Sequence, residues 1–187
     1  MIKLSILIPT IVGREETYNA LIKQLSGQHK SSEIEICTEK DNKESPIGAK
    51  RNKLLQMARG EYVVSIDDDD TVSDNYIELM LKAIESGCDC ASLKGIITTN
   101  GGDPRIFEHS LKYNDWRTNS DEVEVKYERY PNHLNLCKAS IAKQFRFPET
   151  TFGEDHVWSK AVHEAGALKT EYYIDDIIYF YDFKTNK

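Results

Sequence analysis

The chain lacks the long apolar run of a membrane protein, since no stretch approaches the roughly 20 residues of a spanning helix. Its first ten residues hold one lysine, a short apolar run and a proline, without the cleavage-site pattern of a secretory signal. Basic residues are in the minority, 24 against 31 acidic ones, which gives a net charge of −7. Proteins that mainly hold nucleic acid usually have a basic face, so this balance argues against that class. We expect a cytoplasmic protein without an integral membrane segment.

Cysteines are few, and their spacing suits neither a disulfide framework nor a zinc site. There are four in the chain, and without a secretory signal they are expected to be reduced thiols. Cys88 and Cys90 are separated by one residue rather than the about two to four typical of zinc ligands, and no matching pair follows. We therefore predict core packing for these two residues and for Cys37 and Cys137.

The composition of the 187 residues is typical of one folded domain. Hydrophobic residues make up 40% and charged residues 29%, which excludes disorder and low complexity. Strand-like and helix-like stretches alternate in the first half, with an expected loop over residues 38–45. We predict strands over residues 2–8, 33–37 and 61–66, and helices over residues 14–25, 48–58 and about 73–87. Three strand–helix units in a row predict a parallel sheet.

The second half changes pattern, with mostly strand-like stretches and one late helix. The Ser73 hydroxyl is the expected cap of the helix that precedes this half. We predict strands over residues 88–99, 105–111 and 123–130, a turn over 100–103, a helix over 154–165 and a closing β region over 172–183. No repeat or linker interrupts the chain, so the prediction is a single α/β domain, residues 1–187, with a mixed sheet.

Four consecutive carboxylates, Asp67 to Asp70, follow the third predicted strand directly. Such a cluster raises its own pKa values or requires a cation if it is buried. The carboxyl ends of strands are where open α/β sheets bind ligands, and carboxylate oxygens suit Mg²⁺ or Mn²⁺ bound to phosphate. The alternative is a solvated acidic loop before a helix. The position directly after a buried strand favours the ligand site.

Three other segments carry candidate functional residues. Lys50 and Arg51 lie in the first turn of a predicted helix, where free amides favour anions but basic side chains oppose the helix dipole. Glu154 and Asp155 begin the late helix, where a carboxylate is either a complement to the dipole or a general base. His133 is a possible ligand or site residue, although a structural histidine is the commoner case.

Four motifs appear in order along the chain: Ser5-Ile6-Leu7-Ile8-Pro9-Thr10, Gly48-Ala49-Lys50-Arg51-Asn52, Gly60 to Asp70, and Gly153-Glu154-Asp155. With these residues the chain resembles the family 2 glycosyltransferases of the GT-A fold over about residues 2–165. The resemblance implies a Rossmann-like mixed β-sheet flanked by helices, with a nucleotide-sugar half at about 1–97 and an acceptor half at about 98–187. It also implies inverting transfer from a nucleotide-diphosphate sugar, usually a UDP-sugar, with Mn²⁺ or Mg²⁺.

The resemblance assigns roles residue by residue. Asp69 of the Asp-X-Asp motif would bind the metal, and Asp155 would be the catalytic base. His133, Glu154 and Trp158 are further candidates for the acceptor side or the site. The implied donor-binding residues are Pro9, Thr10, Lys50, Arg51, Asp67, Asp68 and, for the base, Glu39 or Asp41.

Two other functions fit parts of the pattern. A nucleotidyltransferase also uses a carboxylate-held metal, but it needs a glycine-rich loop after the first strand, where this chain has only Gly13. A non-catalytic module that binds a cation or a sugar is the second alternative. The acceptor stays open among a glycan, a lipid-linked sugar, a protein hydroxyl and a modified nucleobase.

Overall fold

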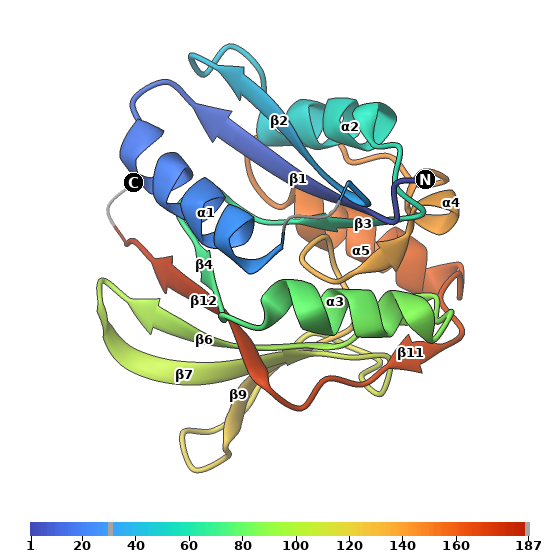
Figure 1. Ribbon diagram of the computed structural model, residues 1–187. Helices are drawn as coiled ribbons and strands as arrows, with labels where there is room; N and C mark the ends of the chain where they lie inside the picture. Colours follow the sequence, from blue (N-terminus) through green and yellow to red (C-terminus); the bar gives the residue numbers. More distant parts are fainter. Residues whose placement is uncertain (30–31, 186–187) are drawn as a thin grey trace.

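The computed structural model describes residues 1–29 and 32–185 and contains two β-sheets with helices packed against them (Figure 1). The helices are α1 (Glu15–Gln28), α2 (Ile47–Met57), α3 (Tyr76–Glu85), α4 (Ala139–Ala142) and α5 (Glu154–Glu164). The strands are β1 (Leu4–Ile11), β2 (Ile34–Asp41), β3 (Tyr62–Ser65), β4 (Thr71–Val72), β5 (Cys90–Ala91), β6 (Leu93–Thr99), β7 (Gly102–His109), β8 (Arg117–Thr118), β9 (Val125–Arg129), β10 (Cys137–Lys138), β11 (Glu171–Tyr172) and β12 (Ile177–Phe183). The expected α/β class with mixed sheets and flanking helices is confirmed.

The first sheet has the order β11-β5-β10-β3-β1-β2. Strand β1 lies between β2 and β3 and is parallel to both, with Leu4 opposite Ile34 on one side and Tyr62 on the other. The three predicted strand–helix units therefore form the expected parallel half of a sheet. Strand β10 is antiparallel to β3 and β5 and makes the sheet mixed.

Side chains of β1 alternate between two hydrophobic cores because successive residues of a strand point to opposite faces. Leu4, Ile6 and Ile8 pack with α1, α3 and part of the second sheet. Leu7 points to the other face, where it packs with α2 and α5. All four are at most 2% exposed, and burying each of them stabilises the fold by about 1.5–3 kcal/mol.

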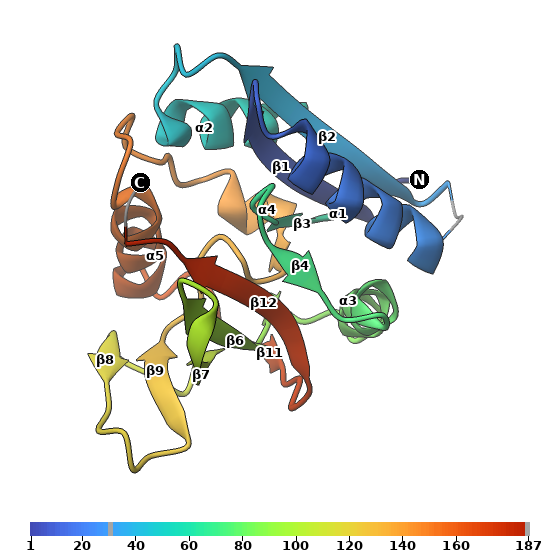
Figure 2. The same ribbon diagram turned by 90° about the vertical axis from the view of Figure 1, so that its left-hand side faces the viewer.

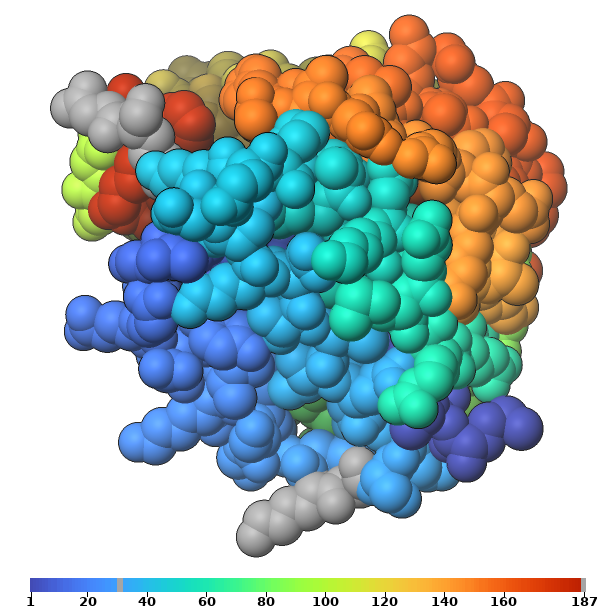
Figure 3. All heavy atoms as spheres, turned by 90° about the horizontal axis from the view of Figure 1, so that it is seen from above, coloured from blue at the N-terminus to red at the C-terminus, as the bar shows by residue number. Residues whose placement is uncertain are grey.

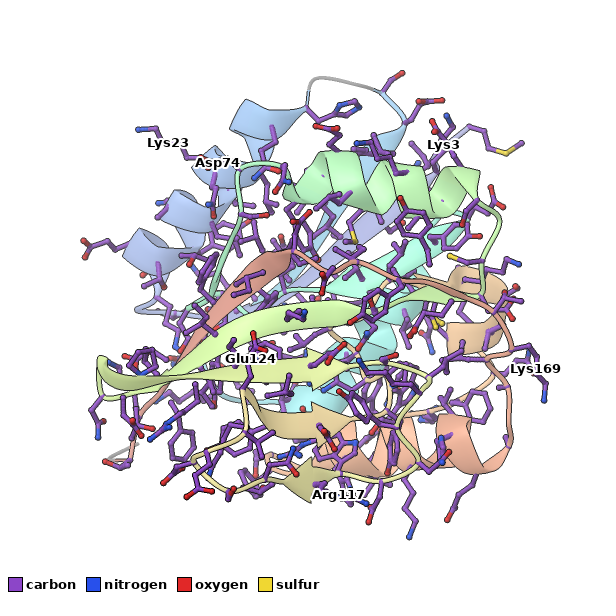
Figure 4. The ribbon with its side chains drawn as sticks, turned by 90° about the horizontal axis from the view of Figure 1, so that it is seen from below. Lys3, Lys23, Asp74, Arg117, Glu124 and Lys169 are labelled. Carbon is purple, nitrogen blue, oxygen red and sulfur yellow. The ribbon has the colours of Figure 1, made fainter. Side chains whose placement is uncertain are left out.

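The second sheet has the order β4-β12-β6-β7-β9-β8 and lies below strands β1 and β2 of the first sheet (Figure 2). Seen from below, its strands cross the face of the molecule, with the exposed side chain of Arg117 at the β8 edge (Figure 4). The predicted single strand over residues 88–99 is wrong, because the chain changes sheets at Ser92, between β5 and β6. The Ser92 hydroxyl bonds to both the amide and the carbonyl of Ile174 at 2.6 and 3.2 Å. The predicted closing region likewise divides into β11 and β12 on the two sides of this contact.

Two local predictions are wrong for tertiary reasons. Residues Thr38 to Asp41 continue β2 instead of forming a loop, because β1 extends to Ile11 and pairs with them. Helix α3 begins at Tyr76, and its capping group is not Ser73. Instead, the Ile77 amide donates to Oε1 of Gln28 in α1 at 3.0 Å.

Helix α1 also holds the chain just before α3. The Gln24 side chain donates to the carbonyl of Val72 at 2.5 Å and accepts from its amide at 3.3 Å. Gln28 donates to the carbonyl of Ser73 at 2.9 Å. The segment that follows the aspartate run is therefore fixed by hydrogen bonds from α1.

The start of α2 approaches the segment before α5 closely, and both appear side by side in the view from above, in cyan and orange (Figure 3). The Gly48 amide donates to the carbonyl of Thr150 at 3.2 Å. A Cβ atom at Gly48 would lie 1.8 Å from the Pro148 carbonyl oxygen. Glycine is therefore required here by contact with the chain itself.

All four cysteines are buried and unbridged, which confirms the prediction of core packing. Among the described residues, no helix is both long enough and apolar enough to cross a bilayer.

Candidate active site

A cavity of about 490 Å³ opens where β1 and β3 end, between the first turns of α2 and α5 and strand β12. It brings together residues that are far apart in the sequence. Of the predicted site residues, it is lined by Pro9, Thr10, Lys50, Arg51, Asp67, Asp68, Asp69, His133, Glu154 and Asp155. The remaining lining residues are Ile11, Arg14, Lys43, Ser45, Ile47, Thr151, Phe152 and Tyr181.

Arg51 connects three parts of the cavity wall and is only 4% exposed. Its Nε donates to Glu154 Oε1 at 3.0 Å, and its Nη2 donates to Asp67 Oδ1 at 3.0 Å. His133 Nε2 lies 4.0 Å from Asp67 Oδ2. Burial alone raises the pKa of Asp67, but the neighbouring Arg51 and His133 more than offset it and hold that pKa below its ordinary value. Asp67 is thus a carboxylate held in place by the guanidinium group of Arg51, with the His133 imidazole nearby.

Arg14 lies between the next two carboxylates. Its Nη1 is 2.6 Å from Asp68 Oδ1 and 3.2 Å from Asp69 Oδ2. The second oxygen of Asp68 accepts from the Thr10 hydroxyl at 2.6 Å, and the Asp68 side chain is only 3% exposed. The Asp69 side chain is 31% exposed and lines the cavity. The Asp69 carboxylate is therefore the more accessible of the two.

The fourth aspartate has a structural contact outside the cavity lining. Tyr179 of β12 donates its hydroxyl to Asp70 Oδ2 at 2.6 Å and accepts from the Asp67 amide at 3.3 Å. Asp70 is 6% exposed and Tyr179 is fully buried. Burial, followed by the charges of Asp70 and Asp67, raises the Tyr179 pKa well above its ordinary value. The hydroxyl therefore stays protonated and fixes the turn formed by the aspartates.

Lys50 is buried at the cavity wall and binds the ends of β1 and β2. Its Nζ donates to the Thr10 carbonyl at 2.9 Å and forms an ion pair with Asp41. Desolvation raises the pKa of Asp41, but hydrogen bonds from Lys50 and from the Ser45 and Lys43 amides outweigh it and lower that pKa to about 2. Asp41 is thus occupied by contacts within the protein.

Three predicted site residues do not line the cavity. Asp41 pairs with Lys50 as described, and Glu39 forms an ion pair with Lys53 at 2.5 Å. Trp158 is 3% exposed, stacks on Phe147 at 5.0 Å between ring centroids and belongs to the second hydrophobic core. Its position is that of a packing residue.

Neighbouring carboxylates at the start of α5 differ in their contacts. Glu154 is 5% exposed and bonded to Arg51. Asp155 lines the cavity, and no described side chain or amide forms a hydrogen bond or an ion pair with its carboxylate. Gly153, with a φ of 76°, makes the turn into the helix and separates this pair from the preceding loop. The Asp155 carboxylate is therefore available to a substrate.

Several buried nitrogen atoms of the wall have no hydrogen-bond partner among the described residues: Arg51 Nη1, His133 Nδ1 and His133 Nε2. An unsatisfied buried donor costs about 1–3 kcal/mol, so such groups usually serve a ligand or water. Phosphate oxygens are good acceptors for a guanidinium group. These atoms make the wall suitable for an anion.

The cavity wall offers few ligands for a metal ion. The described residues contain no group of three or more His, Cys, Asp and Glu side chains that could hold one. Mg²⁺ commonly uses one or two carboxylates, with water and substrate phosphate as the other ligands. The exposed Asp69 carboxylate fits that arrangement, whereas an all-protein metal site does not fit this wall.

Tyr181 and Arg14 were absent from the residues predicted for the site. Tyr181 comes from β12, and burial, together with the charges of the nearby aspartates, raises its pKa to about 12. Its only signal in the sequence is the alternation typical of a strand. One signal could have identified Arg14 as a site residue: a basic residue where a helix begins opposes the helix dipole, as Lys50 and Arg51 do.

Comparison with known proteins adds two findings. The model of the family described as glycosyl transferase family 2 matches residues 13–146. No curated protein matches the chain.

Solved structures of S. aureus TarS share the fold. The chain aligns with TarS residues 1–349 in complex with UDP at a TM-score of 0.68 and 17% identity, covering 97% of this chain and 60% of that one. For the complex with UDP-GlcNAc the TM-score is 0.64, the identity 14% and the coverage 100% and 60%. A longer TarS structure gives a TM-score of 0.64 at 16% identity and is covered to 37%. The chain thus spans between about a third and three fifths of the structures it matches.

Proposed function

We propose that this chain, which belongs to glycosyl transferase family 2, is a glycosyltransferase that transfers a sugar from a nucleotide-diphosphate donor to an acceptor hydroxyl with inversion. The donor proposed is a UDP-sugar, because the S. aureus TarS structures of the same fold were solved with UDP and UDP-GlcNAc. The proposed arrangement is one GT-A domain with a nucleotide-sugar half at about 1–97 and an acceptor half at about 98–187.

One observation carries this proposal: among the described residues, a single cavity holds a cationic nitrogen without a hydrogen-bond partner on one wall and a carboxylate without one on another. Arg51 Nη1 suits the diphosphate, and Asp155 suits a hydroxyl that must lose a proton. Glycosyl transfer from a nucleotide sugar needs both groups at the same anomeric carbon.

On the donor side, Pro9 and Thr10 border the nucleotide in this proposal. Glu39 and Asp41 are poor candidates for holding the base, because their carboxylates pair with lysines and do not line the cavity. Lys43, which lines the cavity after β2, replaces them as the proposed contact on the base side.

Asp69 is the proposed protein ligand of Mn²⁺ or Mg²⁺, shared with diphosphate oxygens. When bound there, the cation supplies positive charge to the leaving diphosphate. Lys50 and Arg51 add fixed positive charge to the same wall. Asp67, held by Arg51, and Asp68, held by Thr10, are proposed to face the ribose or the donor sugar.

In the transfer step, Asp155 accepts the proton of the acceptor hydroxyl as its oxygen bonds to the anomeric carbon. The bond from that carbon to the diphosphate oxygen breaks, and its electron pair leaves with the diphosphate. Attack on the face opposite the leaving group inverts the anomeric centre. In the transition state the anomeric carbon has the positive charge of an oxocarbenium ion. Arg51 Nη1 and one ring N–H of His133 donate hydrogen bonds to the developing negative charge.

The acceptor is proposed only as a hydroxyl of a glycan, a lipid-linked sugar, a protein or a modified nucleobase. Phe152, which is 90% exposed and lines the cavity, lies in the loop that leads to Asp155. Its exposure places an aromatic ring where an acceptor would enter.

Binding of nucleotides tests the donor site directly. Thermal unfolding is followed with UDP, GDP, CDP and TDP, each with Mn²⁺ and with a chelator. A ligand at 100 times its Kd stabilises the folded state by about 2.7 kcal/mol, which shifts the melting temperature measurably. We expect a metal-dependent shift with UDP. No shift with any nucleotide, in protein shown to be folded, would refute the donor site and favour a cation- or sugar-binding module.

Analysis of the products distinguishes glycosyl transfer from nucleotidyl transfer. Release of UDP from a UDP-sugar supports the proposal, whereas release of pyrophosphate from a nucleoside triphosphate supports a nucleotidyltransferase. Asp69→Asn is the matched variant for the metal: it should weaken Mn²⁺-dependent binding of UDP by at least about tenfold. Unchanged binding in this variant would place the metal elsewhere.

A further inference from the structure

Arg14 occupies the space between two carboxylates that a cation would occupy. One nitrogen atom, Nη1, contacts Asp68 Oδ1 at 2.6 Å and Asp69 Oδ2 at 3.2 Å. We propose that Arg14 is a resident counter-cation of this pair, which excludes a free divalent cation and admits it only together with the nucleotide diphosphate. This inference rests on the proposed function, because it takes Asp69 as the metal-binding carboxylate.

The local structure holds the Arg14 backbone firmly. Gly13, with a φ of 93°, turns the chain out of β1, and the Arg14 amide donates to the Ile11 carbonyl at 3.3 Å. The Arg14 carbonyl accepts from Tyr18 and Thr17 in the first turn of α1. This position opposes the helix dipole, so the basic residue is not there to stabilise the helix.

The Arg14 side chain is the more accessible of the two arginines in the cavity wall. It is 32% exposed and lines the cavity, whereas Arg51 is 4% exposed. A guanidinium group exchanges readily between carboxylate and phosphate because its planar donors suit both. Arg14 thus has a second set of acceptors available once a diphosphate enters the cavity.

Charge balance explains why metal and nucleotide would enter together. Without nucleotide, a divalent cation held between Asp68 and Asp69 must displace Arg14 from both carboxylates, the two acceptors that its guanidinium has among the described side chains. With nucleotide, the displaced guanidinium bonds to phosphate oxygens, and the diphosphate also supplies ligands to the metal. Each of the two ligands therefore raises the affinity for the other, which is a positive coupling between their binding sites.

Binding of Mn²⁺ without nucleotide tests this inference, with free Mn²⁺ measured by electron paramagnetic resonance. Arg14→Ala should bind Mn²⁺ at least about tenfold more tightly than the unmodified protein, within the range usual for coupled sites. Arg14→Lys should show a smaller gain, because it keeps the charge. Adding Asp69→Asn to Arg14→Ala should abolish the gain and so locate it at this pair.

Arg59→Ala is the matched control, since Arg59 also binds a carboxylate, Glu35 at 2.7 Å, but lies outside the cavity and is 75% exposed. Its Mn²⁺ affinity should equal that of the unmodified protein. Equal affinities in Arg14→Ala, Arg14→Lys and the unmodified protein, all shown to be folded by circular dichroism, would overturn the inference.

A parallel titration with UDP separates this inference from the proposed function. If Arg14→Ala gains Mn²⁺ affinity but no form of the protein binds UDP, the donor site fails while the role of Arg14 at the carboxylate pair stands. If UDP binds and Arg14→Ala gains nothing for Mn²⁺, the donor site stands and the role of Arg14 fails. A reduced coupling between Mn²⁺ and UDP in Arg14→Ala completes the expected result.

Discussion

Replacing Asp155 by asparagine tests the general base with little disturbance of the fold. The two side chains have nearly the same shape, and the Asp155 carboxylate forms no hydrogen bond or ion pair within the described part of the chain. Because Asp155 lies in the first turn of α5, loss of its charge removes a favourable interaction with the helix dipole of about 0.3–1 kcal/mol. The free energy of unfolding, from urea denaturation, should therefore fall by no more than that amount, and the affinity for UDP should not change.

The rate of transfer should fall strongly in this variant, because an amide cannot accept the hydroxyl proton. Positioned general bases contribute about 10²–10⁴-fold, so we expect a loss in that range. Release of UDP from a UDP-sugar is the assay, since it reports turnover whether the acceptor is a hydroxyl of a substrate or water. A variant that retained turnover within threefold would refute the assignment of Asp155.

Glu154→Gln is the comparison for the same helix turn. Glu154 is buried against Arg51 at 3.0 Å, and removing one partner of a buried ion pair costs about 3 kcal/mol at the lower end of the usual range. We therefore expect loss of stability in Glu154→Gln and loss of turnover in Asp155→Asn. Equal stability in both variants would contradict the difference in contacts described here.

The remaining predictions concern the wall and the core. Tyr179→Phe removes the 2.6 Å hydrogen bond to buried Asp70 and should lower the free energy of unfolding by about 1–3 kcal/mol in urea denaturation. Gly48→Ala places a Cβ atom 1.8 Å from a carbonyl oxygen and should lower the melting temperature, while Gly27→Ala, with open space around it, should not. Burial lowers the pKa of His109 from 6.5 to about 3, so between these pH values only the unfolded chain binds that proton and stability falls as the pH falls. His109→Gln should remove this contribution, up to about 1.4 kcal/mol per pH unit, from denaturation curves measured at pH 4 to 7, and an unchanged slope would contradict the burial argument.

Much of the site was predictable from the sequence because its residues follow from strand ends and helix starts. Asp67 to Asp69 come directly after a buried strand, and Lys50 and Arg51 begin the preceding helix. In a parallel sheet, strand ends and the helix starts that follow them meet at one edge. The structure accordingly places all five of these residues on one cavity.

Other features depended on contacts between distant parts of the chain, which local patterns do not contain. The cap of α3 comes from Gln28, about fifty residues earlier, so the nearby Ser73 was a misleading signal. Asp41 pairs with Lys50 and does not line the cavity, although the family resemblance implied that Glu39 or Asp41 contacts the base. Strand β6 begins a second sheet at a point where the sequence shows only continuous β propensity.

The hydroxyl of Tyr179 has a consequence for the order in which the molecule can be assembled. The aspartate turn, Asp67 to Asp70, lies in the first half of the chain, but its shape depends on a bond from β12, more than a hundred residues later. While only the residues before Ile177 have been synthesised, these carboxylates lack the hydrogen bonds of the Tyr179 hydroxyl. The chain should then become able to bind a donor only late during synthesis. Neither the half that contains the aspartates nor the half that contains β12 should bind it alone.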